Sequence, residues 1–383
     1  MKKLSSRIIP SSLCALLLAA ALPFFAALTS GCSQKSQNGK TAAKIDFDQT
    51  RYIVALSRTY DDKALLVCIG ADGDVSQTIS YKGQAINCID RIGNDLYLHS
   101  ERVNRHYILT EQGEWQTFSY DEDSGTYFTL IGENGLIEAT NIGFVDGGYE
   151  SSIIYTEGDM KKVVSLKDYL PMSAVEYAGK IYVSADHYTS EEAQVVFIID
   201  RQTGEYTTVR FTHEYTPFSG KLVLVNDKIV TYGTNADMLH VCEDKTVYRT
   251  IGVLDTKTLE TKEIDCGSDE ILLMYEHLGQ IRTVTGSGKL NIYADDLTLV
   301  ESRELENTDF VDKCRSDDLH LSKMIVKDEK IAFLFINANL DPKDAGIIQE
   351  YSKADLQPIC TVNILLPECK QWMGELSDFI MLE

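Results

Sequence analysis

One pattern recurs seven times along this chain: a short apolar strand, a polar turn, and a second strand in which polar and apolar residues alternate. The clearest copy is VVFIIDRQTGEYTTVRF at residues 195–211, and the other six begin at residues 65, 106, 151, 250, 289 and 346. Two such runs joined by Asp, Gly, Thr, Lys or Glu predict a β-hairpin. A chain built from seven hairpins has to pair or cover many strand edges.

Another short strand precedes each hairpin and carries an aliphatic residue near its start. These residues are spaced 40 to 52 positions apart: Ile53, Leu96, Leu136, Ile181, Ile229, Ile281 and Ile331. A period in the forties is typical of propeller blades. A fourth strand lies ahead of six of the seven units, which gives four strands per repeat, the content of one blade.

The first repeat lacks its leading strand, whereas the chain ends in DFIMLE (378–383), a strand with no partner of its own. We therefore predict an all-β, seven-bladed β-propeller with four antiparallel strands per blade, closed by pairing of the C-terminal strand into the first blade. The propeller domain is expected to span residues 45–383. A single all-β domain of that length is ordinary, and a hydrophobic content of 44% is sufficient for a core.

The N-terminus has the order of a secretory signal. Lys2, Lys3 and Arg7 precede an apolar stretch from Leu13 to Leu28, and small residues follow before Cys32. The apolar stretch is short for a transmembrane helix.

The TSGC ending at residues 29–32 resembles the lipobox of bacterial lipoproteins, although Thr29 stands where that family usually has Leu. The resemblance implies a signal peptide at residues 1–31, cleavage after Gly31, and fatty acyl chains on Cys32 that anchor the protein to a bacterial membrane on its extracytoplasmic side. Residues 32–44 then form a flexible tether. The alternative is ordinary secretion, with Cys32 unmodified.

The hairpins at 195–211 and 250–265 resemble those of the pyrroloquinoline-quinone-like and surface-layer-like (YVTN-type) propellers, in which a strand ends in Asp and a Thr-Gly or Thr-Leu turn follows. The quinoprotein enzymes of that group carry Trp-containing motifs in successive blades, whereas this chain has only 2 Trp. The resemblance therefore implies no quinone, and we predict no cofactor.

The charge of the chain excludes several classes of partner. The formal net charge is −22, and residues 1–31 hold three positive charges and no negative ones, so the processed chain carries about −25. Such a chain repels nucleic acid and anionic lipid surfaces.

We find no catalytic motif, whether HExxH, GxSxG or a phosphate-binding loop, and predict no catalytic residue. His99 and His106 flank one loop, but with no Cys or third His nearby an exposed hairpin rim is favoured over a metal site. The acidic runs ADGD (71–74) and YDEDSG (120–125) do not complete a calcium loop and indicate solvated turns. No metal is predicted.

Cysteine spacing leaves two interpretations open. Cys360 with Cys369, and Cys242 with Cys266, are close enough in sequence to form disulfides outside the cytoplasm. Buried free thiols are equally compatible with the spacing.

The loops after the second strand of each repeat vary most in length, and they carry the candidate binding residues. Aromatic and arginine side chains, which are enriched at recognition surfaces, stand out there on an acidic body. The candidates are Tyr60, Arg102, Arg105, Phe144, His187, Tyr188, Met238 and His240. The alternative is that these loops are long without a binding role.

The function predicted from these features is that of a membrane-anchored, monomeric, non-catalytic binding or scaffold module for a protein or cell-envelope polymer. The alternative is a glycan- or small-molecule-binding protein, or an enzyme, that uses the central pocket of the propeller.

Overall fold

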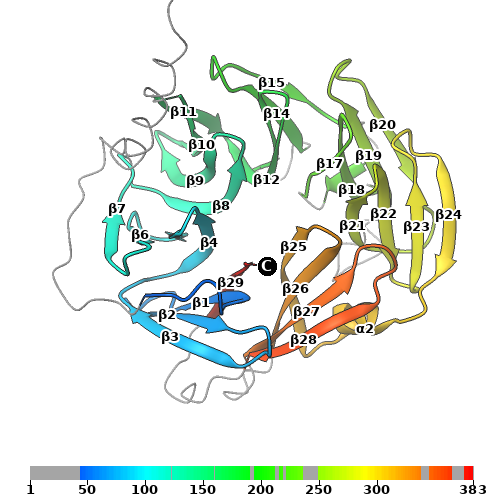
Figure 1. The fold of residues 1–383 in the computed structure, drawn as a ribbon. Helices are drawn as coiled ribbons and strands as arrows, with labels where there is room; N and C mark the ends of the chain where they lie inside the picture. Colours follow the sequence, from blue (N-terminus) through cyan, green and yellow to red (C-terminus); the bar gives the residue numbers. More distant parts are fainter. Residues whose placement is uncertain are drawn as a thin grey trace, which may run out of the picture.

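The computed structural model describes residues 44–121, 123–158, 160–189, 194–211, 215–218, 221–235, 249–337, 345–364 and 375–382. These residues form seven small antiparallel sheets arranged in a ring (Figure 1). The predicted seven-bladed propeller is confirmed.

Each sheet is one blade, whose strands follow one another from the ring centre outward. Blade 1 consists of β29 (Glu375–Met381), β1 (Tyr52–Ser57), β2 (Ala64–Ile69) and β3 (Val75–Tyr81). Blade 2 consists of β4 (Ile86–Ile92), β5 (Asp95–Ser100), β6 (His106–Leu109) and β7 (Trp115–Phe118). Blade 3 consists of β8 (Gly125–Gly132), β9 (Gly135–Val145), β10 (Gly148–Glu157) and β11 (Met160–Lys167). Blade 4 consists of β12 (Tyr169–Tyr177), β13 (Lys180–His187), β14 (Val195–Asp200) and β15 (Tyr206–Val209).

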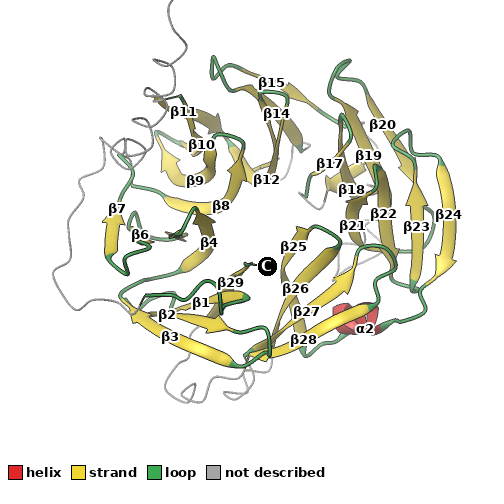
Figure 2. Cartoon of the chain, viewed as in Figure 1, coloured by secondary structure: helices red, strands yellow, loops and turns green. Residues whose placement is uncertain are grey.

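The second half of the ring departs from this plan at two places. In blade 5, β16 (Tyr215–Phe218) and β17 (Val223–Val225) both pair with β18 (Lys228–Asn235), which is followed by β19 (Thr250–Asp255) and β20 (Thr261–Asp265). Blade 6 consists of β21 (Ile271–His277), β22 (Gln280–Thr285), β23 (Lys289–Tyr293) and β24 (Leu299–Glu304). Blade 7 consists of β25 (Leu319–Lys327), β26 (Lys330–Asn337), β27 (Gly346–Ser352) and β28 (Pro358–Ile364). Helix α2 (Asp309–Arg315), which the sequence analysis did not predict, links blades 6 and 7 (Figure 2).

The strand sequences explain which strands lie between neighbouring blades. All six residues of β2, ALLVCI, are buried because both faces of this strand are covered, and apolar runs without alternation are typical of such strands. The outer strand β3 is mostly exposed, with Ile79 as its one buried residue.

Among the described residues, no helix is both long and apolar enough to cross a membrane.

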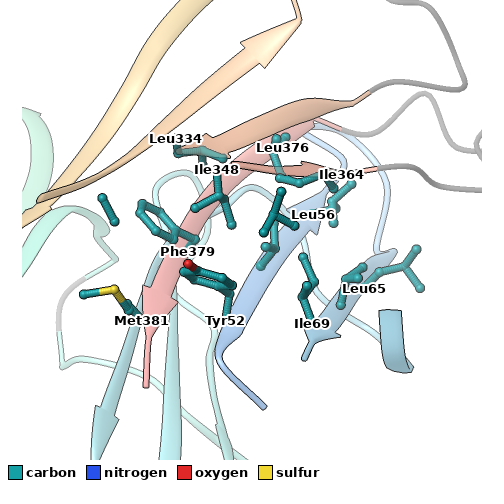
Figure 3. Packing of buried hydrophobic residues seen from close by; sticks show 14 residues of the cluster. Tyr52, Leu56, Leu65, Ile69, Leu334, Ile348, Ile364, Leu376, Phe379 and Met381 are labelled. Carbon is teal, nitrogen blue, oxygen red and sulfur yellow. The ribbon is translucent and has the colours of Figure 1, made fainter. Parts of the chain in front are cut away.

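The ring closes as predicted, with the C-terminal strand β29 pairing antiparallel to β1. Met381 lies opposite Tyr52, and Ile380 opposite Ile53. Figure 3 shows the side chains of β29 between those of β1 and those of blade 7. Phe379 is fully buried in this cluster, which joins the two ends of the chain through one apolar core.

Charged groups reinforce the closure. The Nζ atom of Lys323, on β25, lies 2.6 Å from the carboxylate of Asp378 on β29. That carboxylate also accepts a hydrogen bond from the Ile89 N–H of blade 2, at 2.8 Å. At the same junction of blades 7 and 1, the buried Glu350 of β27 binds the Arg51 guanidinium and the Tyr52 hydroxyl. Two ion pairs with buried carboxylates therefore join blade 7 to blade 1, and one of these carboxylates also binds a backbone N–H of blade 2.

The antiparallel order gives the ring two distinct faces. The connections between second and third strands, and those from one blade to the next, emerge on one side, which we call the loop face. The Ala85 N–H donates to the Arg58 carbonyl at 2.8 Å, and the Glu101 N–H donates to the Ala85 carbonyl at 3.0 Å, so connections of both kinds are in contact there. The opposite side, which carries the short hairpin turns, is the turn face. Residues 44–48 lie on the turn face, beside Asn94 and Glu111.

Candidate recognition face

A hollow of about 650 Å³ opens on the loop face over blades 1, 2 and 3. It is lined by Thr59, Tyr60, Gln84, Glu101, Arg102, Val103, Asp123, Ser124, Gly125, Tyr127, Asn141, Ile142 and Gly143. Most of these side chains are polar. Gly125 allows the start of β8 to approach blade 2, because a Cβ atom there would lie 1.8 Å from the Glu101 carbonyl oxygen.

Two of the predicted binding residues, Tyr60 and Arg102, line the blade 1–2 side of this hollow, and Arg105 lies in the same loop as Arg102. Tyr60 is 82% exposed, and the Arg102 guanidinium lies over its ring, 5.5 Å from the centroid. The Arg102 Nε atom is 3.3 Å from Glu101, and an Arg105 nitrogen is 2.8 Å from Asp62. The two arginines are thus neutralised by neighbouring carboxylates, and this side of the hollow is not a free cationic patch.

An aromatic cluster stands beside the hollow, where blade 3 meets blade 4. We define it as Phe144, Tyr149, Tyr169, His187 and Tyr188. The Phe144 ring lies edge-on to Tyr149 and Tyr188, with centroids 5.5 and 5.9 Å apart, while Tyr149 and Tyr188 stack at 6.1 Å. His187 contacts Tyr188 and Tyr169, each at 5.2 Å. Phe144 is 75% exposed and Tyr188 is 37% exposed, so the cluster presents ring surface to solvent.

Hydrogen bonds connect the aromatic cluster to the wall of the hollow. The Tyr149 hydroxyl donates to Asn141 Oδ1 at 2.7 Å. Because that oxygen can only accept, the neighbouring Tyr127 hydroxyl donates to Tyr149. Burial raises the pKa of both tyrosines, which keeps the two hydroxyls protonated. Tyr127 and Asn141 line the hollow, so the two features form one continuous surface.

A single residue, Asp168, positions Tyr149 and Tyr188. It forms the link between β11 and β12 and has a left-handed backbone, with φ 65°. Its Oδ1 accepts from the Tyr149 N–H at 3.1 Å, and its own N–H donates to the Tyr149 carbonyl at 2.7 Å. The Tyr188 N–H donates to the Asp168 carbonyl at 3.0 Å. Asp tolerates this conformation better than most residues.

The structure brings six of the predicted residues together in two groups. Tyr60, Arg102 and Arg105 lie in the loops of blades 1 and 2, and Phe144, His187 and Tyr188 belong to the aromatic cluster. Cys32, Met238 and His240 lie outside the described residues.

The sequence patterns do not predict Tyr127, Asn141, Tyr149 and Asp168 as site residues. Residues 141–150 are one of the loops expected after the second strand of each repeat, whereas β9 and β10 extend through most of that range and turn at Asp146 and Gly147. The Gly147-Gly148 doublet was the available signal for this turn.

The expectation that His99 and His106 form an exposed hairpin rim is wrong. Both side chains are fully buried, because the ends of β5 and β6 that carry them are covered by blade 3 and by the residues after β7. In the part of the chain that the structure describes, no group of three His, Cys, Asp or Glu side chains is placed to hold a metal ion.

The described cysteines carry free thiols. Cys266 and Cys360, for which the spacing left a disulfide and a free thiol equally open, are free, and their candidate partners, Cys242 and Cys369, lie outside the described residues. Cys68 and Cys88 are buried, and burial raises the pKa of Cys68 to about 12 and that of Cys88 well above its ordinary value. Both thiols therefore stay protonated and behave as small apolar side chains.

The sequence matches no protein-family profile and no curated protein. Its similarities are to solved structures. They include apo AztD from Citrobacter koseri (10% identity, TM-score 0.46, 82% of this chain and 95% of that one) and BamB from Moraxella catarrhalis (12%, 0.45, 87% and 92%). A virginiamycin B lyase from Staphylococcus aureus is also similar (14%, 0.46, 79% and 96%). These similarities assign no activity to the chain, whose seven-bladed β-propeller fold follows from its own sheet order.

Proposed function

We propose that this protein is a lipid-anchored, extracytoplasmic binding module that recognises a protein partner through its loop face and performs no catalysis. The observation that carries the proposal is the aromatic cluster beside the hollow, with Phe144 and Tyr188 exposed on a rigid scaffold. Contiguous exposed aromatic surface is uncommon on monomeric proteins and marks interaction sites.

The chemistry of this surface fits a protein partner. Exposed rings supply large contact area with few rotatable bonds, and the surrounding amide and carboxylate groups can satisfy backbone and side-chain hydrogen bonds. Arg102 and Arg105 pair with Glu101 and Asp62, so these groups offer a partner hydrogen-bond donors and acceptors side by side. A ring of rigid sheets also keeps loops from different blades at fixed distances, which lowers the entropic cost of binding.

Anchoring rests on the lipobox-like TSGC sequence, and we propose that Cys32 is acylated. Changing Cys32→Ser is expected to move the protein from the membrane fraction to the soluble fraction after cell lysis. Membrane recovery equal to that of the wild type would contradict lipidation without affecting the proposal for the loop face.

The loop face is tested by photo-crosslinking in living cells, with the probe placed in turn at Tyr60, Phe144 and Tyr188. Leu278, on the turn face and 77% exposed, provides the matched control position. We expect one protein adduct to recur from the loop-face positions and to be absent at Leu278. The adducted partner, once purified, should bind the Tyr188→Ala variant at least about tenfold more weakly than the wild type.

Two outcomes would contradict this proposal. Equal crosslinking from Leu278 and the loop face would show non-specific contact. Unchanged affinity in both Tyr188→Ala and Phe144→Ala would remove the aromatic cluster from the interface, and a glycan or small molecule bound in the ring would then become the better hypothesis.

A further inference from the structure

Two fully buried histidines lie beneath the loop that forms one wall of the hollow. His99, near the end of β5, and His106, at the start of β6, have ring centroids 5.4 Å apart. Phe118 stacks on His106 at 5.1 Å and lies edge-on to His99 at 5.7 Å. Between the two histidines the chain forms loop 101–105, which carries both Arg102 and Arg105.

Hydrogen bonding fixes the protonation state of His106. Its Nδ1 atom accepts from the Ser100 N–H at 3.2 Å, so Nδ1 bears no proton and the neutral ring carries its hydrogen on Nε2. In the described part of the chain, this Nε2 has no hydrogen-bond partner.

Ser100 is also the base of loop 101–105. Its Oγ atom accepts from the N–H groups of Arg102 and Val103, at 3.4 and 3.2 Å, and donates to the Gln84 carbonyl at 2.7 Å. The hydrogen bond from the Ser100 N–H to His106 Nδ1 therefore helps to fix Ser100, the residue to which loop 101–105 is hydrogen-bonded.

Among the described residues, one carboxylate contacts the histidine pair, and it lies beside His99. Glu138, on β9, places Oε2 at 3.3 Å from His99 Nδ1, and the Tyr120 hydroxyl lies 3.4 Å from the same nitrogen. Lys161 places its Nζ 5.5 Å from the Tyr120 ring centroid and 3.7 Å from Asp121, and Arg105 directly precedes His106 in the chain. No described carboxylate forms an ion pair with His106.

We propose that protonation of His106 releases loop 101–105 and thereby changes the binding face. We call the hydrogen bond from the Ser100 N–H to His106 Nδ1 the latch. A proton added to Nδ1 turns the acceptor of the Ser100 N–H bond into a second donor, so this bond is lost and two N–H groups face each other. Ser100 then moves away, and the wall formed by Glu101, Arg102 and Val103 loosens. Burial and the nearby His99 hold the pKa of His106 well below its ordinary value, so the latch is closed at neutral pH and opens under acid conditions.

The opening of the latch can be measured without any partner, by amide hydrogen exchange in the purified full-length protein. Exchange of residues 101–105, corrected for the intrinsic effect of pH, is followed from about pH 7.5 to about pH 4. We expect the corrected rate to rise at least about tenfold over this range, while the corresponding loop of blade 6, residues 286–288, changes little.

A variant separates the latch from general acid effects. In His106→Asn, the amide oxygen can accept the Ser100 N–H in place of Nδ1 but cannot be protonated, so protection of the loop should become independent of pH. His277→Asn, which replaces another buried histidine far from the loop, is the matched control and should keep the wild-type response.

Two results would overturn the latch: a wild-type loop whose protection does not change with pH, or a His106→Asn loop that still opens in acid. If His106→Asn does not fold, ¹⁵N spectra of the wild-type histidine rings decide, because a His106 ring that carries its hydrogen on Nδ1 at neutral pH contradicts the proposal. The link to binding rests on the proposed function, but none of these readouts requires it.

Discussion

Asp168 links two blades with one residue and positions two tyrosines through its backbone and side chain. An alanine there would lose the side-chain bond to Tyr149 and would occupy a left-handed conformation that costs alanine more than aspartate. We expect Asp168→Ala to lower the free energy of unfolding by about 1–2 kcal/mol and to reduce the near-ultraviolet circular dichroism of the cluster.

Asn is the matched replacement for Asp168. It tolerates the same backbone conformation and can accept the same hydrogen bond, so Asp168→Asn should lie close to the wild type in urea unfolding and in the spectrum. If Asp168→Ala unfolds at the wild-type urea concentration, the link does not position the tyrosines as described.

Leu278 presents the opposite case, a residue poorly suited to its turn. It precedes Gly279 in the hairpin between β21 and β22, has φ 54°, and is 77% exposed. Asn is the preferred residue at such a position. Leu278→Asn is therefore expected to raise the free energy of unfolding by about 0.5–1 kcal/mol, measured by urea denaturation.

The control for Leu278 is Leu299, an exposed leucine at the start of strand β24. Because Asn is unfavourable in strands, Leu299→Asn should not stabilise the protein. A gain of the same size in both variants would show that removing an exposed leucine, and not correcting the turn, was responsible.

Among the elements, β29 is the strand that closes the ring. It completes blade 1, supplies Phe379 to the core shared with blade 7, and carries Asp378, which pairs with Lys323. Deleting residues 374–383 exposes the edge of β1 and leaves the Lys323 ammonium without its partner. We expect this variant to lose cooperative thermal unfolding or to melt at least about 10 °C lower.

A deletion of equal length in the predicted tether, residues 33–42, provides the comparison for this truncation. That deletion should leave the melting temperature unchanged. A truncated protein that also melts like the wild type would mean that the ring does not depend on its C-terminal strand.

The repeated pattern predicted the strands well, because each blade is determined by the alternation of polar and apolar residues along its strands and by the residue types in its turns. The spare strand at the C-terminus even predicted how the ring closes, since an unpaired strand and a three-stranded blade complete each other. Helix α2 was missed because its seven residues bury Phe310 and Val311 against blade 7, which is a tertiary effect. Local patterns carry no information about such packing.

The sequence predicted only some of the side chains that come together at the candidate site, because their meeting also depends on tertiary packing. Loop lengths pointed to Phe144 and Tyr188, but nothing in the sequence shows that Tyr149 and Tyr127 meet across blade 3. The histidine pair was misplaced because burial of His99 depends on Glu138, which is 39 residues away in the chain and belongs to another blade. Contacts between blades arise from ring geometry, which repeat spacing fixes only coarsely.

At the scale of the whole molecule, stability should depend on pH near neutrality. Burial lowers the pKa of His106 and of His277 in the folded state, so the unfolded chain binds more protons than the folded one as the pH falls through about 6.5. The free energy of unfolding should therefore decrease from about pH 7.5 to about pH 5, by at most about 1.4 kcal/mol per pH unit for each histidine, and level off below the folded-state pKa values.

Urea unfolding at a series of pH values measures this dependence. The surface carboxylates Asp227 and Asp255 have lowered pKa values, so their contribution is lost only in stronger acid, below about pH 4. His106→Asn should make the profile shallower between about pH 7 and about pH 5. A wild-type profile that is flat over that interval would contradict the assigned burial effects.

If Cys32 is acylated as proposed, the position of residues 44–48 on the turn face would bring that face toward the membrane. A flexible span of the predicted tether's length, residues 32–44, has a root-mean-square reach of roughly 20 Å, less than the thickness of a membrane's hydrocarbon core. The short hairpin turns would then face the lipid headgroups, and the aromatic cluster would face away from the membrane. A partner embedded in the same membrane would have to reach around the rim of the ring, whereas one suspended from the far side of the envelope would meet the binding face head-on.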